Sequence, residues 1–261
     1  MQSLIDTTVD GHVHTRRCGH AVGEMAEYVE QAAARGLRAI TFLEHLETGI
    51  NYQPRSWLEQ EDFDDYFAEG LRLRERFRGV IEVRLGVETG YNPAAPAAVR
   101  ARLARYSWDR VGLSCHFHAH GGNHLNLLSR RQESLDTFAA IGVGRVLSRY
   151  FDALIAAIRE IDCDVLCHLD AALRHYPALR FDESHRQQIV DLLDAVQERG
   201  VALEINTSGF DFRGTPFPAP WIITLALERG IPLSAGSDAH RPEDVGRYFD
   251  RLPAFLTSLS A

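Results

Sequence analysis

Short apolar segments alternate along the chain with longer stretches in which apolar residues recur at helical spacing. Seven segments have the length and apolar content of buried strands: residues 8–14, 37–43, 81–87, 110–115, 163–168, 201–206 and 231–236. Six stretches have helical periodicity: residues 24–35, 62–78, 95–105, 146–161, 183–199 and 220–229. Four of these helices are followed at once by glycine, which favours the left-handed conformation that ends many helices.

Repeated alternation of strands and helices predicts parallel strands joined by crossover helices. Two architectures remain open, a closed or nearly closed barrel and an open doubly wound sheet. No Gly-x-Gly-x-x-Gly motif follows the first strand, so the main sign of a dinucleotide-binding sheet is missing. The length fits one large domain, and we predict a single domain over residues 1–261. The irregular stretches 47–61 and 116–133 are expected to shape its active site.

Composition and charge narrow the classes of partner. The formal net charge is -8, which does not suggest the basic surface of a nucleic-acid binder. An anionic substrate remains compatible with this charge, because bound divalent metals reverse the local sign of a pocket. The N-terminus lacks a basic segment followed by an apolar run, and no apolar stretch approaches ~20 residues. We therefore expect a cytoplasmic enzyme with no membrane partner.

The 12 histidines give the strongest chemical signal. His12 and His14 end the first strand at positions i and i+2, which point to the same side of a strand. His20 lies in the loop after this strand, and other ligand-type residues end later strands or follow them closely: His45, Glu88, His116, His168, Asp238 and His240. The sixth strand carries Glu204 and Asn206, which could orient the ligands. Active sites of parallel barrels lie at this end of the strands, so we predict a metal cluster of zinc, iron, manganese or nickel.

Further histidines and cysteines near these positions have two interpretations. His118, His120 and His124 lie in a glycine-containing segment that is either a solvated, mobile loop or a substrate-facing or auxiliary metal loop. Cys115 and Cys167 alternate with histidines predicted to face the pocket. Because alternate residues of a strand point to opposite faces, we expect these two thiols to pack in the core.

The segments DGHVHTRRCGH, LEH, GVE, SCH, CHLD and GSDAH, in this order, resemble the PHP (polymerase and histidinol phosphatase) superfamily over nearly the whole chain. Within it, HTRRCGHAVGEMAEYVEQAAARGL, LEINTSG and GSDAHRPEDVG resemble the monofunctional histidinol-phosphatase branch. The resemblance implies a distorted (β/α)7 TIM-like barrel with two or three divalent metal ions, zinc, iron or manganese. It also implies hydrolysis of a small phosphate monoester, L-histidinol phosphate, in histidine biosynthesis.

The resemblance also implies a role for each candidate ligand. One ion would be held by four residues: His12, His14, Glu88 and Asp238. Glu88 would bridge to a second ion that His116 also binds, so Glu88 and Asp238 are the catalytic candidates. A third ion would be held by His20, His45, His168 and His240. The family often has Asp where Glu44 stands. The sequence departs from the branch after His116, where HFHAHGGNHLN is unusually rich in histidine and glycine, so substrate identity depends on this segment.

Hydrolysis of a phosphate monoester needs a nucleophile at neutral pH and positive charge around the phosphoryl group. Metal coordination lowers the pKa of water to roughly 7 in favourable sites. A planar guanidinium binds phosphate in a bidentate manner, and Arg17, Arg174 and Arg213 all lie in predicted loops on the metal side. Asp170 and Glu44 are equal candidates for the acid that protonates the leaving alkoxide.

Three other functions compete with this interpretation. A different PHP phosphoesterase would act on nucleotides, although no aromatic–basic stretch suited to long nucleic acids occurs. A C–N amidohydrolase barrel would usually need a carboxylated lysine at a strand end, and no predicted strand end carries lysine. An inactive metal-binding module would be expected to have lost some ligands, whereas all nine are present.

Overall fold

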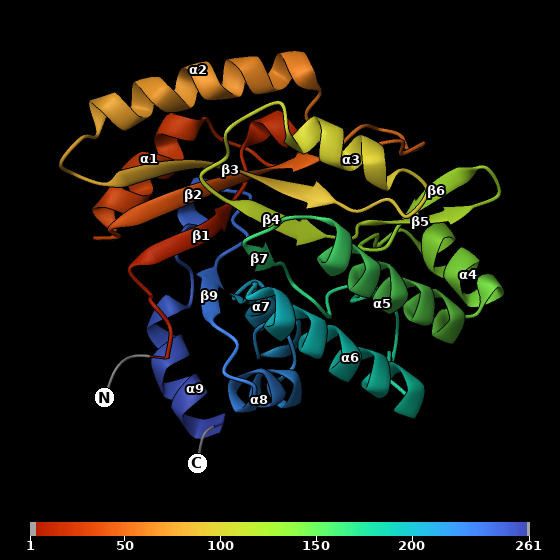
Figure 1. Cartoon of the computed structure of the whole chain (residues 1–261). Coiled ribbons are helices and arrows are strands. Elements are labelled where there is room, and N and C mark those ends of the chain that lie inside the picture. Colours follow the sequence, from red (N-terminus) through yellow and green to blue (C-terminus); the bar gives the residue numbers. More distant parts are fainter. Residues whose placement is uncertain (1–3, 260–261) are drawn as a thin grey trace.

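Seven parallel strands form one sheet in which spatial order follows chain order (Figure 1). The computed structural model describes residues 4–259, so both ends of the predicted single domain lie outside the described residues. The strands are β1 (Val9–Val13), β2 (Ala39–Leu46), β3 (Glu82–Gly90), β4 (Val111–Ser114), β7 (Val165–Leu166), β8 (Ala202–Asn206) and β9 (Leu233–Gly236). All seven predicted strand segments are confirmed.

The two edges of the sheet approach each other at their carboxyl ends and nearly close a barrel. His14 N donates to Ala239 O at 2.9 Å, and Asp238 N donates to His12 O at 2.9 Å. Further back, a Cβ added at Gly11 would lie 2.8 Å from Ala235 O, so only glycine permits this approach. The contacts that close the barrel therefore come from the segments that carry predicted ligands. The predicted barrel is confirmed over the open sheet.

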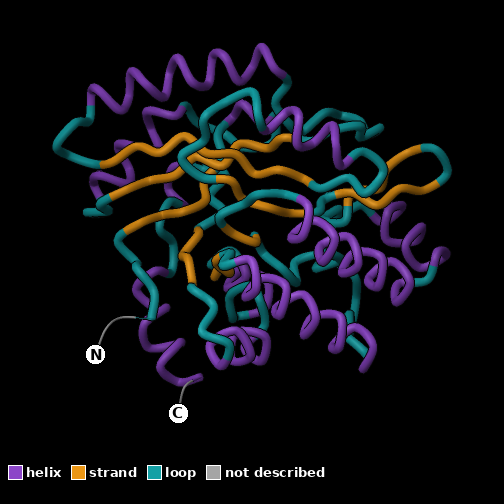
Figure 2. The backbone as a smooth tube through the Cα atoms, viewed as in Figure 1, coloured by secondary structure: helices purple, strands orange, loops and turns teal. Residues whose placement is uncertain are grey.

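The helices lie outside the strands, as Figure 2 shows. They are α1 (Met25–Ala34), α2 (Gln60–Arg76), α3 (Pro96–Leu103), α4 (Gln132–Ile141), α5 (Val143–Glu160), α6 (Glu183–Arg199), α7 (Gly209–Arg213), α8 (Pro220–Glu228) and α9 (Leu252–Leu259), with 3-10 turns η1 (Arg16–Cys18), η2 (Pro242–Asp244) and η3 (Phe249–Arg251). The six predicted helices are confirmed, and α4, α7 and α9 were not predicted. No helix in the described part of the chain is long and apolar enough to cross a lipid bilayer.

The glycines that were predicted to end helices have left-handed φ values between 66° and 79°: Gly36, Gly79, Gly200 and Gly230. Gly200 is the C-cap of α6, where its N–H bonds the carbonyls of Val196 and Gln197. A side chain in this conformation would be strained, so glycine here fixes the end of the helix and its return to β8.

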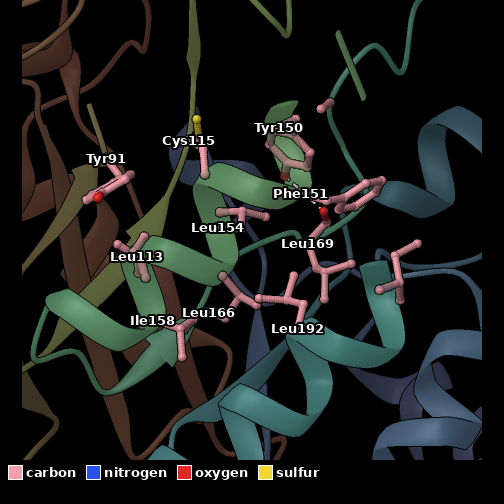
Figure 3. Close-up of a cluster of buried hydrophobic side chains, with 14 of the residues drawn as sticks. Tyr91, Leu113, Cys115, Tyr150, Phe151, Leu154, Ile158, Leu166, Leu169 and Leu192 are labelled. Atoms are coloured by element: carbon pink, nitrogen blue, oxygen red, sulfur yellow. Dashed lines mark hydrogen bonds between the residues drawn. The ribbon is translucent and has the colours of Figure 1, made fainter. Parts of the chain in front are cut away.

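Apolar side chains fill both the outside and the inside of the barrel wall. Figure 3 shows part of the cluster between α5, α6 and the strands, where Leu113, Phe151 and Leu192 are buried. Inside the barrel, Leu43 of β2 contacts Val165 and Cys167 across the axis. The predicted packing role of Cys167 is confirmed, as is that of Cys115 in the outer cluster.

The histidine-rich segment after β4 is an antiparallel hairpin of β5 (Phe117–His120) and β6 (Asn123–Asn126). The segment therefore has regular structure where a loop was predicted. Its base is anchored because Leu127 N donates to His116 O at 2.8 Å, and its far strand is anchored because His124 N donates to Asn51 O at 2.9 Å. Histidine, alanine and asparagine occupy most positions of these strands, so the sequence carried little of the β-branched and aromatic content by which strands are recognised.

Candidate metal centre

A cavity of about 330 Å³ opens at the carboxyl ends of the barrel strands. Seven of the nine predicted ligands line it: His20, His45, Glu88, His116, His168, Asp238 and His240. The remaining two, His12 and His14, are fully buried and contact Glu88 and Asp238. The structure thus brings all nine predicted ligands together from six strands.

Glu88 lies at the centre of the cluster, and its two carboxylate oxygens face different histidines. Oε1 is 2.7 Å from His168 Nε2 and 3.2 Å from His116 Nε2. Oε2 is 2.9 Å from His45 Nδ1 and 3.6 Å from His14 Nε2. The carboxylate is fully buried, so it joins two groups of histidines in a position suited to bridging two ions.

His12 is held in a fixed orientation by a carboxylate behind it. Its Nδ1 is 2.6 Å from Oε1 of buried Glu204, while Oε2 of Glu204 accepts from His168 N at 2.8 Å. An imidazole that donates Nδ1–H to a carboxylate presents the lone pair of Nε2, as metal-binding histidines commonly do. Glu204 therefore orients two predicted ligands, in agreement with the supporting role that its position in the sequence suggested.

Several atoms of the cluster, most of them buried, lack an ordinary hydrogen-bond partner. The Nε2 atoms of His12 and His14 face each other at 2.8 Å, and those of His20 and His240 face each other at 2.9 Å. Oε2 of Glu88 is buried without a hydrogen bond among the described residues. Because buried polar atoms are normally paired, facing lone pairs and an unpaired carboxylate oxygen fit ligands for cations.

The electrostatics of the cluster also favour a bound cation. Burial lowers the pKa of His116, but Glu88 and Glu47 outweigh it and raise the pKa to about 10. Burial and the neighbouring imidazoles of His45 and His240 lower the pKa of His20 to about 3. Positive charge near the buried carboxylates is thus stabilising, but the histidines lie too close together for all of them to be protonated. A divalent ion satisfies both conditions.

Two of the predicted ligands have unusual backbone geometry. His168 has φ 27° and Asp238 has φ 51°, in the left-handed region that residues other than glycine rarely adopt. Strain of this kind costs on the order of 1–3 kcal/mol and persists mainly at functional sites. Both residues directly follow a barrel strand, where this turn of the chain directs them into the cluster.

The grouping of the ligands differs in one respect from the one that the resemblance implied. His168 was expected beside His20, His45 and His240. Its Nε2 instead contacts Glu88 Oε1, and its ring centroid lies 5.6 Å from that of His116. The cause is the strand order, because β7 is the neighbour of β4 in the sheet.

The geometry can be compared with known proteins. A PHP domain model matches residues 10–208, and a model described as PHP-associated matches residues 222–257. The chain belongs to the PHP family. Its relatives in this family include a Deinococcus radiodurans protein named as a probable histidinol-phosphatase, with 31% identity over 92% of this chain and 89% of the relative.

Two further proteins are similar to this chain over nearly their whole length. A histidinol-phosphatase of Bacillus subtilis is 27% identical over 95% of this chain and 97% of the relative. A Lactococcus lactis histidinol phosphate phosphatase, solved with zinc, L-histidinol and phosphate, superposes with a TM-score of 0.77. It is 18% identical and covers 96% of this chain and 93% of its own. This structural similarity supports the PHP barrel fold.

The three arginines predicted to bind phosphate in this PHP chain have different surroundings. Arg174 lines the cavity, and its Nε is buried without a partner among the described residues. Arg17 instead pairs with Glu69 of α2. Arg213 pairs with Asp170 at 2.8 Å. Neither Arg17 nor Arg213 is among the residues that line the cavity, so the structure does not support their predicted substrate contact.

The two residues considered as the general acid also lie outside the cavity lining. Asp170 accepts hydrogen bonds from Arg213 and from Ala219 N. Glu44 accepts from both the backbone N–H and the hydroxyl of Thr15. Both carboxylates therefore hold loops of the PHP barrel in place.

Sequence reasoning missed one acidic residue of the cavity. Glu47 is buried, lines the cavity and lies 2.7 Å from His116 Nδ1 through its Oε1. It follows β2 by one residue, within a stretch that has no regular pattern. Its only sequence signal is this position at a strand end, which it shares with the predicted ligands.

The histidines of the β5–β6 hairpin do not join the metal cluster. His118 and His124 line a second cavity of about 400 Å³ with Cys115 and Arg149. His120 is exposed at the hairpin tip and lines neither cavity. The hairpin residues that do face the metal cavity are Phe117 and Asn126.

Proposed function

We propose that this PHP protein hydrolyses L-histidinol phosphate to L-histidinol and phosphate, with two or three divalent metal ions bound in the cavity. The observation that carries the proposal is the position of Glu88, whose oxygens face two separate groups of histidines. The family membership and the names of the relatives support the phosphatase activity. The zinc, L-histidinol and phosphate in the Lactococcus lactis relative support the substrate.

The contacts suggest how the residues share the ions. His116 and His168 would bind one ion with Oε1 of Glu88, given their distances of 3.2 and 2.7 Å. A second would be held by His12, His14, Asp238 and Oε2 of Glu88, and a third by His20, His45 and His240. Imidazole and carboxylate ligands suit zinc, iron and manganese. Bound divalent ions supply Lewis acidity, which lowers the pKa of water and neutralises charge on the phosphoryl group.

Arg174 is the residue of this chain that we assign to the phosphate. Its guanidinium stacks 4.6 Å above the ring centroid of Phe212, which fixes the plane of the group. Burial lowers the pKa of Arg174, and the nearby carboxylates of Asp238 and Glu88 offset only part of this effect. The guanidinium still stays protonated, as arginine does in proteins. A fixed, charged fork of N–H donors at the cavity wall can bind two phosphate oxygens at once.

We also propose that the chain acts as one domain. The segment that matches the PHP-associated model includes β9, which pairs with β8 inside the barrel. Its C-terminal helix α9 contributes Leu252 and Leu256 to the same core as β1 and β2. The location in the cytoplasm stays a prediction from the sequence.

The absence of lysine counts further against the competing C–N hydrolase hypothesis. The sequence contains no lysine at any position, since all 28 basic residues are arginine. A carboxylated lysine therefore cannot form anywhere in this chain. Phosphate esters remain the substrates that the cavity suits.

A panel of phosphate esters tests the proposed function. We expect zinc-loaded protein to release phosphate from L-histidinol phosphate with a kcat/KM at least about tenfold higher than from adenosine monophosphate or p-nitrophenyl phosphate. Colorimetric assay of inorganic phosphate gives the rates. A preference for the nucleotide would instead assign the chain to another PHP phosphoesterase activity. Turnover of none of the esters by metal-loaded protein would contradict the phosphatase function itself.

A further inference from the structure

Part of the wall of the metal cavity consists of residues that cannot bind metal strongly. Apart from the candidate ligands, Glu47 and Arg174, the lining consists of Ser56, Phe117, Asn126 and Leu128, three of them from the β5–β6 hairpin and the residues after it. A phosphate ester whose phosphoryl group meets the metal ligands must place its alcohol part against other residues. This wall therefore determines which alcohols fit.

Phe117 presents a rigid aromatic surface on this wall. It is only 7% exposed, and its ring contacts two others, with centroids 5.0 Å from Tyr52 and 5.9 Å from Trp57. Tilted and edge contacts of this kind stabilise aromatic pairs. Because these contacts hold the ring in place where it lines the cavity, we expect it to receive a planar group without rearranging.

Asn126 lies directly opposite Phe117 in the hairpin register. Residues opposite each other in an antiparallel pair present their side chains on the same face. Its Oδ1 accepts from Leu128 N at 2.7 Å, and this bond orients the amide. Among the described residues, Nδ2 of Asn126 donates no hydrogen bond, so its two N–H groups are available at the cavity wall.

The hairpin is fixed relative to the metal ligands. Leu127, next to Asn126, donates to His116 O and accepts from Leu173 N, both at 2.8 Å. Leu173 in turn directly precedes Arg174, the proposed phosphate ligand. The same short segment of chain therefore sets the distance between the ring-binding wall and the phosphate-binding residues.

We infer that Phe117 and Asn126 form the subsite that selects the leaving alcohol, with Phe117 stacking on an imidazole ring and Asn126 donating to its unprotonated nitrogen. This inference rests on the proposed function. A neutral imidazole is planar and has one acceptor nitrogen, which matches one aromatic face and one amide donor. An alkyl phosphate offers neither feature and gains nothing from this wall.

Two substrates and four variants test the subsite. We compare L-histidinol phosphate with glycerol phosphate, which has no ring, using zinc-loaded protein. Phe117→Leu, Phe117→Ala and Asn126→Ala are each expected to lower kcat/KM for L-histidinol phosphate about 10- to 100-fold. For glycerol phosphate the change should stay within about threefold. His120→Ala, in the same hairpin but outside the cavity, should change neither value.

Binding of the product provides a second readout. In titration calorimetry of zinc-loaded protein, the Kd for L-histidinol should be about 10- to 100-fold higher in the Phe117 and Asn126 variants than in the wild type, like the change in kcat/KM. Phe117→Leu keeps an apolar side chain of comparable size, so it remains informative if Phe117→Ala fails to fold.

The outcomes separate the two proposals. Equal losses on both substrates would mean that these residues only support the structure, and no loss on either would mean that the ring binds elsewhere. Both results would overturn the subsite while leaving the phosphatase in place. A wild-type protein that hydrolyses glycerol phosphate but not L-histidinol phosphate would overturn the proposed substrate and the subsite together.

Discussion

Replacement of Glu88 by glutamine is expected to lower kcat/KM for L-histidinol phosphate about a thousandfold or more, because a metal-bridging charge is lost. Glutamine keeps the size of the side chain, so the packing around it should survive. Both oxygens of Glu88 lie within 3.6 Å of histidine nitrogens, and a neutral amide cannot bridge two cations in their place. Metal analysis should show fewer bound ions per chain.

The matched control is Glu82→Gln at the opposite end of the same strand. Glu82 is exposed and pairs with Arg84, far along β3 from the cavity. We expect its kinetics and metal content to stay at the wild-type level. Circular dichroism of both variants reports whether the barrel folds. Wild-type activity and metal content in Glu88→Gln would refute the bridging position.

Replacement of Arg174 by alanine is expected to raise KM about 10- to 100-fold and to weaken inhibition by inorganic phosphate by a similar factor. The guanidinium lines the cavity and has a buried Nε without a partner among the described residues. Arg174→Lys should recover little, because an ammonium is a point charge and cannot form the planar fork. Initial rates over a range of substrate and phosphate concentrations give both constants.

Arg17→Ala is the comparison for this prediction. Arg17 is near His14 and His20 in the sequence, but its guanidinium pairs with Glu69. Its replacement should change KM by no more than about twofold, as is usual for a partly exposed ion pair. If Arg17→Ala impairs phosphate binding as strongly as Arg174→Ala, then phosphate binding was wrongly assigned to Arg174 alone on the basis of which side chain lines the cavity.

The barrel and its ligands were predictable from the sequence because both depend on position along strands. The ends of seven apolar segments identified where chemistry should be, and parallel strands bring their carboxyl ends to one edge. His12 and His14 also shared a side through the two-residue period of a strand. These rules locate backbone positions, so they brought the nine candidate residues to one place in the fold.

Side-chain direction in loops was not predictable in the same way. Arg17, Arg174 and Arg213 were all predicted to lie in loops on the metal side, yet only Arg174 lines the cavity. The other two are directed away by carboxylates distant in sequence, Glu69 and Asp170. Such pairings depend on how α2 and the loop after β7 pack, and no local pattern encodes them.

The β5–β6 hairpin shows a related difficulty. Its register places Phe117 and Asn126 on one side and directs His118 to a separate cavity. In the sequence, the histidines of this segment were the candidates for a function, because imidazole is a common metal ligand. Phenylalanine and asparagine carried no signal until strand pairing showed that they share a face of the hairpin.

In the proposed function, ions bound in this cluster are required for hydrolysis of L-histidinol phosphate. The most direct test is release of inorganic phosphate from L-histidinol phosphate while chelator-treated protein is titrated with zinc. We expect negligible release without metal and a rate that rises with zinc until two or three ions are bound per chain. Release that is unaffected by chelation, or zinc binding without any release, would contradict it.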